Sequence, residues 1–284
     1  MILAAGLGTR LRPLTNDRPK ALVEIGGRTL LEIALSRLRS FGVNEVIVNV
    51  HHFADMIVNY LKTNDDFGMN IEVSREDQLL DTGGGLKKAG HFFTGIFTEN
   101  SVRDSTDREE SPSQPLEDAF IVHNVDVLST IDLRRMVQYH TDNRALATLA
   151  VQDRKTSRYL LFDEHLMLCG RRSGSERPGS GAEAPEHVRP LHGRSVPDRS
   201  VPDHSQPLQA LAFCGIHVIS PRLLTMMVED GAFSIINTYL RLAAAGEKIR
   251  AFRADEFYWR DLGTPESVAR AAHDLDQNSP IPTC

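Results

Sequence analysis

Cysteine, tryptophan and long hydrophobic runs are scarce in this sequence. It contains one tryptophan and three cysteines, and Cys169, Cys214 and Cys284 lie far apart without forming a CxxC pair. This pattern argues against a disulfide framework or a structural zinc site and is typical of a reducing compartment. No stretch approaches the roughly 20 apolar residues of a membrane span. The first residues also lack the apolar region and cleavage site of a signal peptide. We therefore expect a soluble, cytoplasmic protein with no membrane partner.

An excess of positive charge is also absent. The chain has 32 lysines and arginines against 38 aspartates and glutamates, a formal net charge of −6 over 284 residues. A nucleic-acid partner is therefore not expected, although a small phosphorylated ligand needs only a local cluster of positive charge. Hydrophobic residues make up 41% of the chain and charged residues 25%, which are ordinary values for a globular protein. The length fits one large α/β domain with insertions as well as two small domains.

Two segments depart from this globular composition. Residues 98–115 are polar, and residues 170–206 are rich in glycine, proline, serine and arginine, with a tandem Arg-Ser-Val-Pro-Asp repeat at 194–203. Neither segment can bury enough apolar surface to offset its ordering entropy. We predict that both are disordered surface insertions, with a docking or lid role as the alternative. They would interrupt a single domain over residues 1–276, followed by a C-terminal tail at 277–284.

Hydrophobic periodicity predicts alternating strands and helices. In the first half, strands are expected at 1–5, 46–50, 71–74 and 119–123, and helices at 30–41, 56–61, 85–93 and 133–139. The second half has strands at 145–151, 158–162, 211–219, 249–253 and 257–262, and helices at 221–229, 235–245 and 265–276. This alternation predicts an α/β, Rossmann-like fold with a mostly parallel central sheet flanked by helices. Ligands bind at the carboxyl ends of such strands, so residues 6–12, 49–52 and 124–126 should carry function.

A glycine-rich run follows the first predicted strand and gives the strongest functional signal. Its candidate nucleotide-binding residues are Ala4, Ala5, Gly6, Gly8, Thr9, Arg10 and, after Pro19, Lys20. Small residues let a flat ligand approach the backbone, and a glycine turn can direct amides toward phosphate oxygens. The two cations add fixed positive charge where a triphosphate would lie. An ordinary glycine turn would explain an isolated G-x-G, but not the whole run.

The run resembles the signature of the nucleotide-sugar pyrophosphorylases, which are sugar-1-phosphate nucleotidyltransferases. Further matches cover nearly the whole chain apart from the two insertions, at residues 81–85, 124–127, 213–218 and 259–264. The Thr-Gly-Gly-Gly form and the short C-terminus are most similar to the branch of N-acetylmuramate-1-phosphate uridylyltransferases and mannose-1-phosphate guanylyltransferases. From the length we expect no β-helix acyltransferase domain.

The resemblance implies a magnesium-dependent enzyme that joins a nucleoside triphosphate to a sugar 1-phosphate and releases pyrophosphate. Ala4 to Gly6 and the backbone of Gly83 and Gly84 would contact the base. The loop residues Gly8, Thr9 and Arg10 would hold the phosphates, and Lys20 would bridge toward the α-phosphate, so that Arg10 and Lys20 act in catalysis. Asn124 and Gly215 would bind the sugar phosphate, and Asp126 and Asp261 would hold Mg²⁺.

The chemistry itself calls for these residue types. Several negative charges must be brought together, so cations and positioning supply most of the catalysis. Magnesium takes one or two carboxylates plus phosphate oxygens and water. Taken alone, Asp126 could be a helix cap and Asp261 a turn residue. The sequence departs from the family pattern at Val125, where a β-branched side chain disfavours a positive φ and so predicts an extended backbone.

Other candidates are assigned structural roles. Adjacent side chains of an extended segment point to opposite sides, so His51 and His52 are not expected to share a metal. Cys214 and Trp259 are expected to pack in the core. Two alternative functions remain: a catalytically silent nucleotide-sugar-binding regulatory subunit, and a phosphocholine cytidylyltransferase. The base (UTP or GTP), the sugar and the oligomeric state stay open, with a homo-oligomer as one alternative.

Overall fold

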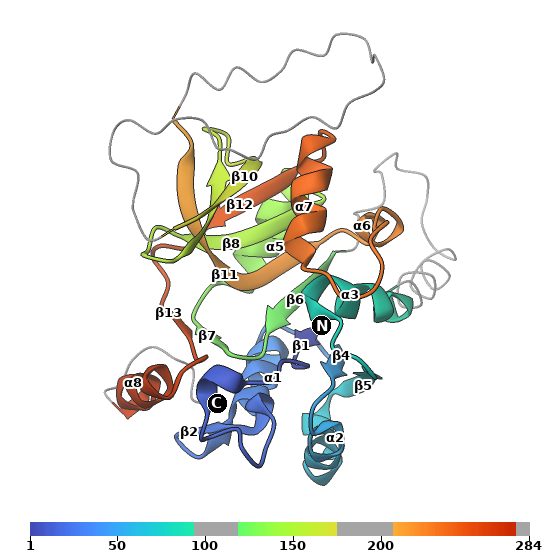
Figure 1. Cartoon of the computed structure of the whole chain (residues 1–284), viewed down its shortest axis with the longest axis vertical. Helices are drawn as coiled ribbons and strands as arrows, with labels where there is room; N and C mark the ends of the chain where they lie inside the picture. Colours follow the sequence, from blue (N-terminus) through green and yellow to red (C-terminus); the bar gives the residue numbers. More distant parts are fainter. Residues whose placement is uncertain (94–118, 175–206, 277–284) are drawn as a thin grey trace, which may run out of the picture.

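A central sheet organises the part of the chain that the structure describes. The computed structural model describes residues 1–93, 119–174 and 207–276 (Figure 1). Within these ranges one sheet has the strand order β10-β9-β11-β6-β1-β4-β5, and β8 pairs with β11 and β12. Its strands are β1 (Ile2–Leu3), β4 (Glu45–Val50), β5 (Asn70–Arg75), β6 (Phe120–Asn124), β8 (Ala147–Gln152), β9 (Arg158–Phe162), β10 (Leu168–Ser173), β11 (Gln209–Ile219) and β12 (Ile249–Arg253). All run in one direction except β10 and β11, so the sheet is mixed and mostly parallel.

Helices cover both faces of this sheet. They are α1 (Leu30–Ser40), α2 (Ala54–Thr63), α3 (Asp81–Lys88), α5 (Leu133–Asp142), α6 (Arg222–Thr225), α7 (Ile235–Ala244) and α8 (Pro265–Asp276). Side chains of β4 alternate between two cores: Val46 and Val48 join the core that includes α1 and α2, whereas Ile47 joins the core that includes α3 and α7. Burial on both faces explains why this strand is a continuous apolar run. The predicted α/β, Rossmann-like class is confirmed.

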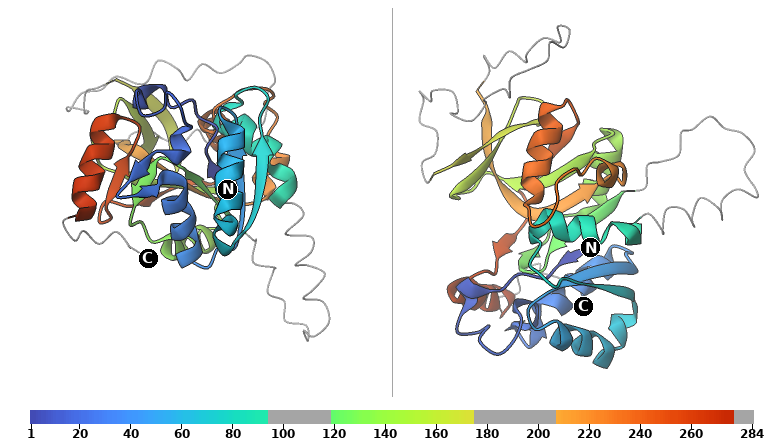
Figure 2. Two further views of the ribbon diagram at one scale, coloured as in Figure 1. Left: turned by 90° about the horizontal axis from the view of Figure 1, so that it is seen from below. Right: turned by 45° about the vertical axis from the view of Figure 1, so that its right-hand side comes forward.

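Short elements link the layers. Strand β2 (Glu24–Ile25) pairs with β3 (Arg28–Thr29), and β7 (Val127–Ser129) pairs with β13 (Trp259–Asp261). Three 3₁₀ turns are described: η1 (Thr9–Leu11), η2 (Lys20–Leu22) and η3 (Asp65–Gly68). The right-hand view of Figure 2 shows the first third of the chain and the red α8 in the lower half of the molecule, with the strands of the second half above them. Strand β13 therefore brings the end of the domain back to β7.

Local sequence explains where the helices begin and end. The hydroxyl of Thr29 accepts a hydrogen bond from the backbone N–H of Glu32 at 3.1 Å, which caps α1. Asp132 caps α5 in the same way, accepting from the N–H of Arg134 at 2.9 Å. Gly42 follows the end of α1 with a φ of 87°, a conformation that glycine adopts without a Cβ clash.

Several boundaries differ from the sequence-based prediction: the helix expected over 221–229, for example, ends at Thr225. Two other differences have a clear physical reason. The helix expected over 85–93 begins at Asp81, so the glycines lie inside α3. Residues 170–173, assigned to a disordered insertion, belong to β10, because backbone pairing with β9 orders a segment that has few apolar side chains. Residues 175–206 of that insertion, residues 98–115 and the tail at 277–284 lie outside the described residues. None of the described helices is long and apolar enough to cross a membrane.

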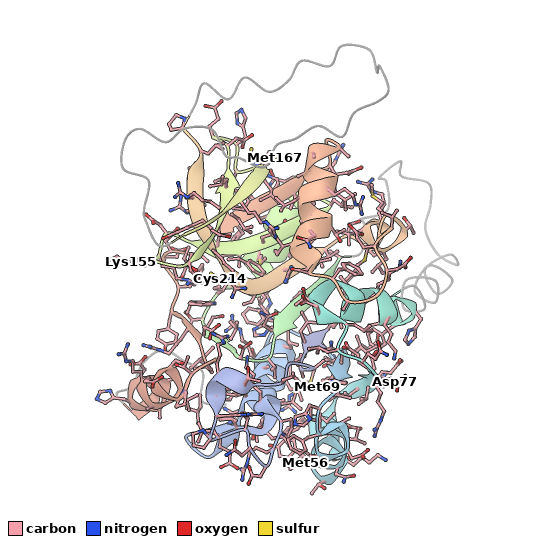
Figure 3. The ribbon with its side chains drawn as sticks, in the orientation of Figure 1. Met56, Met69, Asp77, Lys155, Met167 and Cys214 are labelled. Carbon is pink, nitrogen blue, oxygen red and sulfur yellow. The ribbon has the colours of Figure 1, made fainter. Side chains whose placement is uncertain are left out.

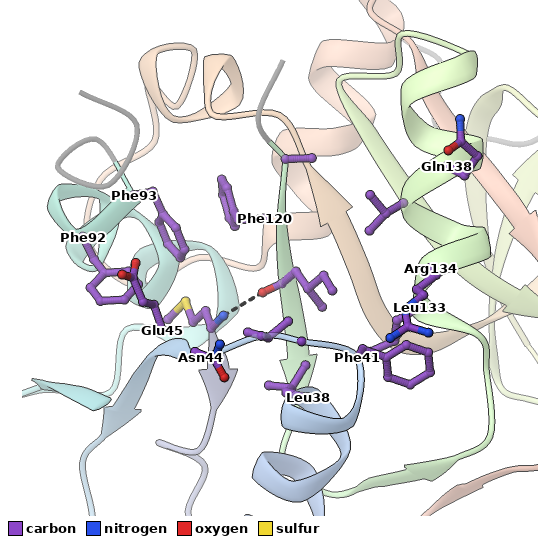
Figure 4. A pocket seen from close by; sticks show the side chains of 16 residues that line it. Leu38, Phe41, Asn44, Glu45, Phe92, Phe93, Phe120, Leu133, Arg134 and Gln138 are labelled. Carbon is purple, nitrogen blue, oxygen red and sulfur yellow. Dashed lines mark hydrogen bonds between the residues drawn. The ribbon is translucent and has the colours of Figure 1, made fainter. Parts of the chain in front are cut away.

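A cavity of about 600 Å³ lies at the amino ends of β1 and β6 (Figure 4). Phe92, Phe93 and Phe120 contribute to its lining. Met1 also lines it, and the Met1 amine donates to the carbonyl of Ile121 at 2.6 Å. Ligands of α/β sheets bind at the carboxyl ends of the strands, which is the opposite end from this cavity.

Candidate functional site

The loop after β1 is built around a tight turn at Gly8. Its φ of 65° is in the left-handed region, and a Cβ there would lie 3.0 Å from Cγ2 of Thr15 and 3.2 Å from Cβ of Lys20. The hydroxyl of Thr15 donates to the Gly8 carbonyl at 2.8 Å, and the N–H of Leu11 donates to the same oxygen at 2.9 Å. The side chains of Thr9 and Arg10 remain exposed. The turn therefore presents the predicted phosphate-binding residues on the surface of a fixed loop.

Three strand ends beside this loop are tied together by a buried polar network. The N–H of Ala4 donates to Oδ1 of Asn49 at 2.8 Å, and Nδ2 of Asn49 donates to Oε1 of Glu76 at 2.7 Å. The other carboxylate oxygen of Glu76 accepts from the N–H of Leu80 at 2.9 Å. A Cβ at Gly85 would lie 2.7 Å from both Asn49 and Glu76, so glycine at this position makes room for the network.

The network includes one residue of a predicted region and adds a residue that the sequence analysis missed. Asn49, only 2% exposed, begins the segment that was expected at the carboxyl end of a strand. Glu76, 5% exposed, was not singled out. The available signal was an acidic residue directly after the β5 run, at a position where a buried carboxylate needs hydrogen-bond donors.

Gly83 and Gly84 lie against the segment that precedes α7. Their N–H groups donate to the carbonyl of Phe233 at 2.8 and 3.3 Å, and a Cβ at Gly83 would overlap the Phe233 ring. The glycines therefore allow close packing of α3, and the structure places both N–H groups in that packing. A base would have to meet other atoms of these residues, so their predicted contact with a base stays a prediction.

The two predicted aspartates lie on neighbouring segments. Strand β6 leads into Asn124 and Asp126, and β13 pairs antiparallel with β7 so that Asp261 is opposite Val127. The N–H of Leu262 donates to the carbonyl of Asp126 at 2.8 Å. Residues 135 positions apart in sequence thus meet at the carboxyl end of β6, one of the strand ends where function was expected.

The two predicted cations join the aspartates. Nζ of Lys20 forms an ion pair with Oδ2 of Asp126. Asp126 is only 8% exposed. Oδ1 of Asp261 accepts from the N–H of Gly263 at 2.7 Å. A Cβ at Gly263 would lie 2.5 Å from Oδ1 of Asp261 and 2.7 Å from Nη2 of Arg10. Arg10 and Asp261 therefore border the same small space, and all the predicted charged residues converge.

Asn124 and Gly215 also meet, on the side of the site nearer the second half of the chain. Gly215 has a φ of 73°, and a Cβ there would lie 2.9 Å from both Nδ2 of Asn124 and Cγ2 of Val127. Oδ1 of Asn124 is buried and has no hydrogen-bond partner among the described residues. The predicted departure at position 125 has a structural reason: Val125 is 4% exposed, packs in the core beneath the site, and is not among the described residues with positive φ.

The register of β11 shifts between Phe213 and His217, and aromatic and cationic side chains gather at this irregularity. Nε1 of Trp259 donates to the carbonyl of Cys214 at 2.7 Å, and the guanidinium of Arg154 lies 3.6 Å from the centre of the Trp259 ring. Figure 3 places Cys214 near the junction with β13, with Lys155 of the β8–β9 loop on the same side. Arg154 was missed by the sequence analysis, which assigned Trp259 only to packing.

Cys214 itself is inert in this setting. Its side chain is fully buried, and burial raises the pKa of its thiol to about 12. A thiol with such a pKa is not a nucleophile at neutral pH. The prediction that Cys214 is a packed small side chain is confirmed.

Carboxylate oxygens are the metal-binding groups that this site offers. Among the described residues, no three His, Cys, Asp or Glu side chains form a cluster that could hold a metal by themselves. Asp126 and Asp261 provide a pair of hard oxygen donors on adjacent segments. Such a pair suits a cation that takes its remaining ligands from substrate oxygens and water.

The chain is similar in sequence to known nucleotidyl transferases. A family model described as "Nucleotidyl transferase" matches residues 1–161. N-acetylmuramate alpha-1-phosphate uridylyltransferase from Caulobacter vibrioides is 52% identical over 274 residues, which cover 95% of this chain and 94% of that protein. Mannose-1-phosphate guanylyltransferase from Mycobacterium tuberculosis is 27% identical and covers 97% of this chain, which spans 64% of that protein.

Solved structures share the fold at low sequence identity. HddC from Yersinia pseudotuberculosis has a TM-score of 0.66 at 21% identity, covering 96% of this chain and 97% of that chain. The inositol-1-phosphate CTP transferase from T. maritima has a TM-score of 0.62 at 15% identity, covering 100% of this chain and 96% of that chain. At these identities the likeness shows the fold alone.

Proposed function

This chain belongs to the nucleotidyl transferase family and is a sugar-1-phosphate nucleotidyltransferase, and on that premise we propose that its substrates are UTP and N-acetylmuramate 1-phosphate. The substrate proposal is supported by the 52% identity to the Caulobacter enzyme, which extends over 95% of this chain. The proposal that this site carries the activity is supported by one observation: Arg10, Lys20, Asp126 and Asp261 converge although they come from distant parts of the sequence.

The reaction needs two anions to meet. A phosphate oxygen of the sugar 1-phosphate attacks the α-phosphorus of the triphosphate, the bond to the β-phosphate oxygen breaks, and pyrophosphate leaves. The exposed loop around Gly8 and the Arg10 side chain would hold the triphosphate by backbone amides and charge. Lys20 would meet the charge that grows at the α-phosphate, held in place by its ion pair with Asp126.

Asp126 and Asp261 fit magnesium by the chemistry of their donor set. Both are carboxylates, and they lie on adjacent strand-end segments. A bound Mg²⁺ would neutralise part of the phosphate charge. The unpartnered Oδ1 of Asn124, opposite Gly215, gives the site an acceptor for a hydroxyl or amide N–H of the sugar.

A pyrophosphate-release assay tests the proposal. UTP, GTP, CTP and dTTP are each paired with N-acetylmuramate 1-phosphate, N-acetylglucosamine 1-phosphate, mannose 1-phosphate and phosphocholine, with and without magnesium. We expect the highest kcat/KM with UTP and N-acetylmuramate 1-phosphate, and no turnover when magnesium is chelated. A higher value for GTP with mannose 1-phosphate would overturn the substrate assignment. Turnover that survives chelation would overturn the metal assignment.

A further inference from the structure

Arg154 is a cation at the site that the proposed function leaves without a role. It lies in the loop between β8 and β9, and its Nη2 donates to the carbonyl of Phe213 at 2.8 Å. The face of its guanidinium lies 3.6 Å from the centre of the Trp259 ring, a short cation–π contact. These two contacts fix both the position and the plane of the charged group.

Each neighbour of Arg154 is continuous with a residue of the site. Trp259 precedes Asp261 by two residues in β13, and Phe213 precedes Gly215 by two residues in β11. The hydrogen bond from Trp259 to the Cys214 carbonyl, at 2.7 Å, ties these two strands together beneath the guanidinium. Arg154 is therefore held where the strand of Asp261 meets the strand that faces Asn124.

Arg154 differs from other arginines of the described chain, because no carboxylate forms a direct ion pair with it there. Arg241, Arg260 and Arg222 each have a carboxylate partner. Arg154 has no ion-pair partner in the described part of the chain, and its Nε is buried without a hydrogen-bond partner there. Burial lowers the pKa of its guanidinium from the ordinary value, while the adjacent Cys214 side chain and, to a smaller extent, nearby Asp261 act in the opposite direction. A guanidinium stays charged at neutral pH, so a partly desolvated cation faces this side of the site.

We propose that Arg154 binds an oxyanion of the sugar substrate, and this inference rests on the proposed function. A planar guanidinium with donors to spare matches an oxyanion geometrically, and only one of its N–H groups is given to Phe213. The triphosphate has its own cations in Arg10 and Lys20. The oxyanion has two possible sources in N-acetylmuramate 1-phosphate: the 1-phosphate and the carboxylate of its lactyl ether.

The test compares Arg154→Met and Arg154→Lys with a matched control, Arg250→Met. Methionine keeps an unbranched apolar stem over Trp259 but removes the charge. Arg250 has the same local features: it lies over an aromatic ring, 5.7 Å from the centre of Tyr139, and donates to a carbonyl, that of His165, at 2.7 Å. Its Nε is also buried without a partner among the described residues, but it lies in β12, outside the site.

We expect Arg154→Met to raise the KM for the sugar 1-phosphate about 10–100-fold, the usual range for a lost hydrogen bond to a charged group, with the KM for UTP unchanged. Arg154→Lys should be intermediate, and Arg250→Met should behave as the parent. An effect confined to N-acetylmuramate 1-phosphate would assign the oxyanion to the carboxylate, and an equal effect with N-acetylglucosamine 1-phosphate would assign it to the 1-phosphate. Either result supports the proposal.

Three results would overturn it: no change in the KM for the sugar 1-phosphate, a change confined to UTP, or equal changes in Arg154→Met and Arg250→Met. If Arg154→Met does not fold, Arg154→Lys carries the test, read as the loss of the thermal shift that the sugar 1-phosphate produces in the parent. A failed substrate assignment is recognised separately, because the parent then turns over another pair in the panel. Arg154 is in that case tested with that sugar 1-phosphate.

Discussion

The two ends of strand β1 are surrounded by side chains of different chemistry. Its amino end opens into the cavity of about 600 Å³ lined by Phe92, Phe93 and Phe120. Its carboxyl end carries the Gly8 loop, the Asn49–Glu76 network and the meeting point of Asp126 with Lys20. This cavity is therefore not where the reacting groups lie. A catalytic site in this fold is identified by converging charge and unpartnered polar atoms at the strand ends, and not by cavity volume.

The difference between the two ends of β1 is tested most strongly by removing the two carboxylates near its carboxyl end. We expect Asp126→Asn and Asp261→Asn each to lower kcat by several powers of ten, because the charge on the phosphates would no longer be neutralised. Pyrophosphate release is measured over a magnesium titration, with circular dichroism to check folding. Asp55→Asn, which breaks an exposed ion pair with Arg75, is the control. Near-parent turnover in either site variant would remove that residue from the metal site.

Lys20→Met should have the next largest effect. The lysine is proposed to meet charge that develops in the transition state, so kcat should fall about 100-fold while the KM for UTP changes little. Lys87 lies on α3 and forms an exposed ion pair with Asp230. Lys87→Met, which breaks this pair, serves as the control. An effect of Lys20→Met on the KM for UTP alone would reassign the lysine to ground-state binding.

Gly85→Ala tests whether the buried network positions the nucleotide loop. The added Cβ would lie 2.7 Å from Asn49 and Glu76, so the network must shift, and with it the N–H of Ala4 that Asn49 holds. We expect kcat/KM for UTP to fall about tenfold, the size of one misaligned polar contact. Gly90→Ala is a matched control, since its Cβ would meet only Leu224 at 3.8 Å. Equal kinetics in the two variants would show that the network has only a structural role.

Much of the fold could be predicted from the sequence because its signals are local. The apolar run of β4 and the capped, periodic segment of α1 are each determined by neighbouring residues, and both match the structure closely. Strand β10 was missed because its pairing with β9 comes from the backbone, while its own side chains are mostly polar. The start of α3 was missed because glycine is a poor helix former, yet here close packing against Phe233 requires it.

The residues of the site also divide into those that a local motif indicates and those that only the three-dimensional structure brings together. Arg10, Lys20, Asp126 and Asp261 could be named because each lies in a short motif, and the strand-end rule independently indicated the segments of Arg10 and Asp126. Arg154 could not be named, because its place depends on a register shift in β11 that brings a carbonyl and an indole ring to it from two distant strands. Side chains whose environment is assembled from far along the chain leave no mark in the local sequence.

The smallest expected effect on turnover comes from the other end of β1. Phe120 stacks on Phe93 with ring centres 3.8 Å apart and is almost fully buried beside the cavity. Phe120→Ala should lower the free energy of unfolding by about 3–5 kcal/mol, the usual cost of truncating a buried phenylalanine. Because a domain of this kind is stable by only about 5–15 kcal/mol, its melting temperature should fall clearly. Below that temperature kcat and both KM values should equal those of the parent, since neither ring contributes to the charged site. Chemical denaturation gives the first quantity and pyrophosphate release the second. A fall in kcat in the folded variant would mean that the two ends of β1 are coupled and that the residues lining the cavity influence catalysis.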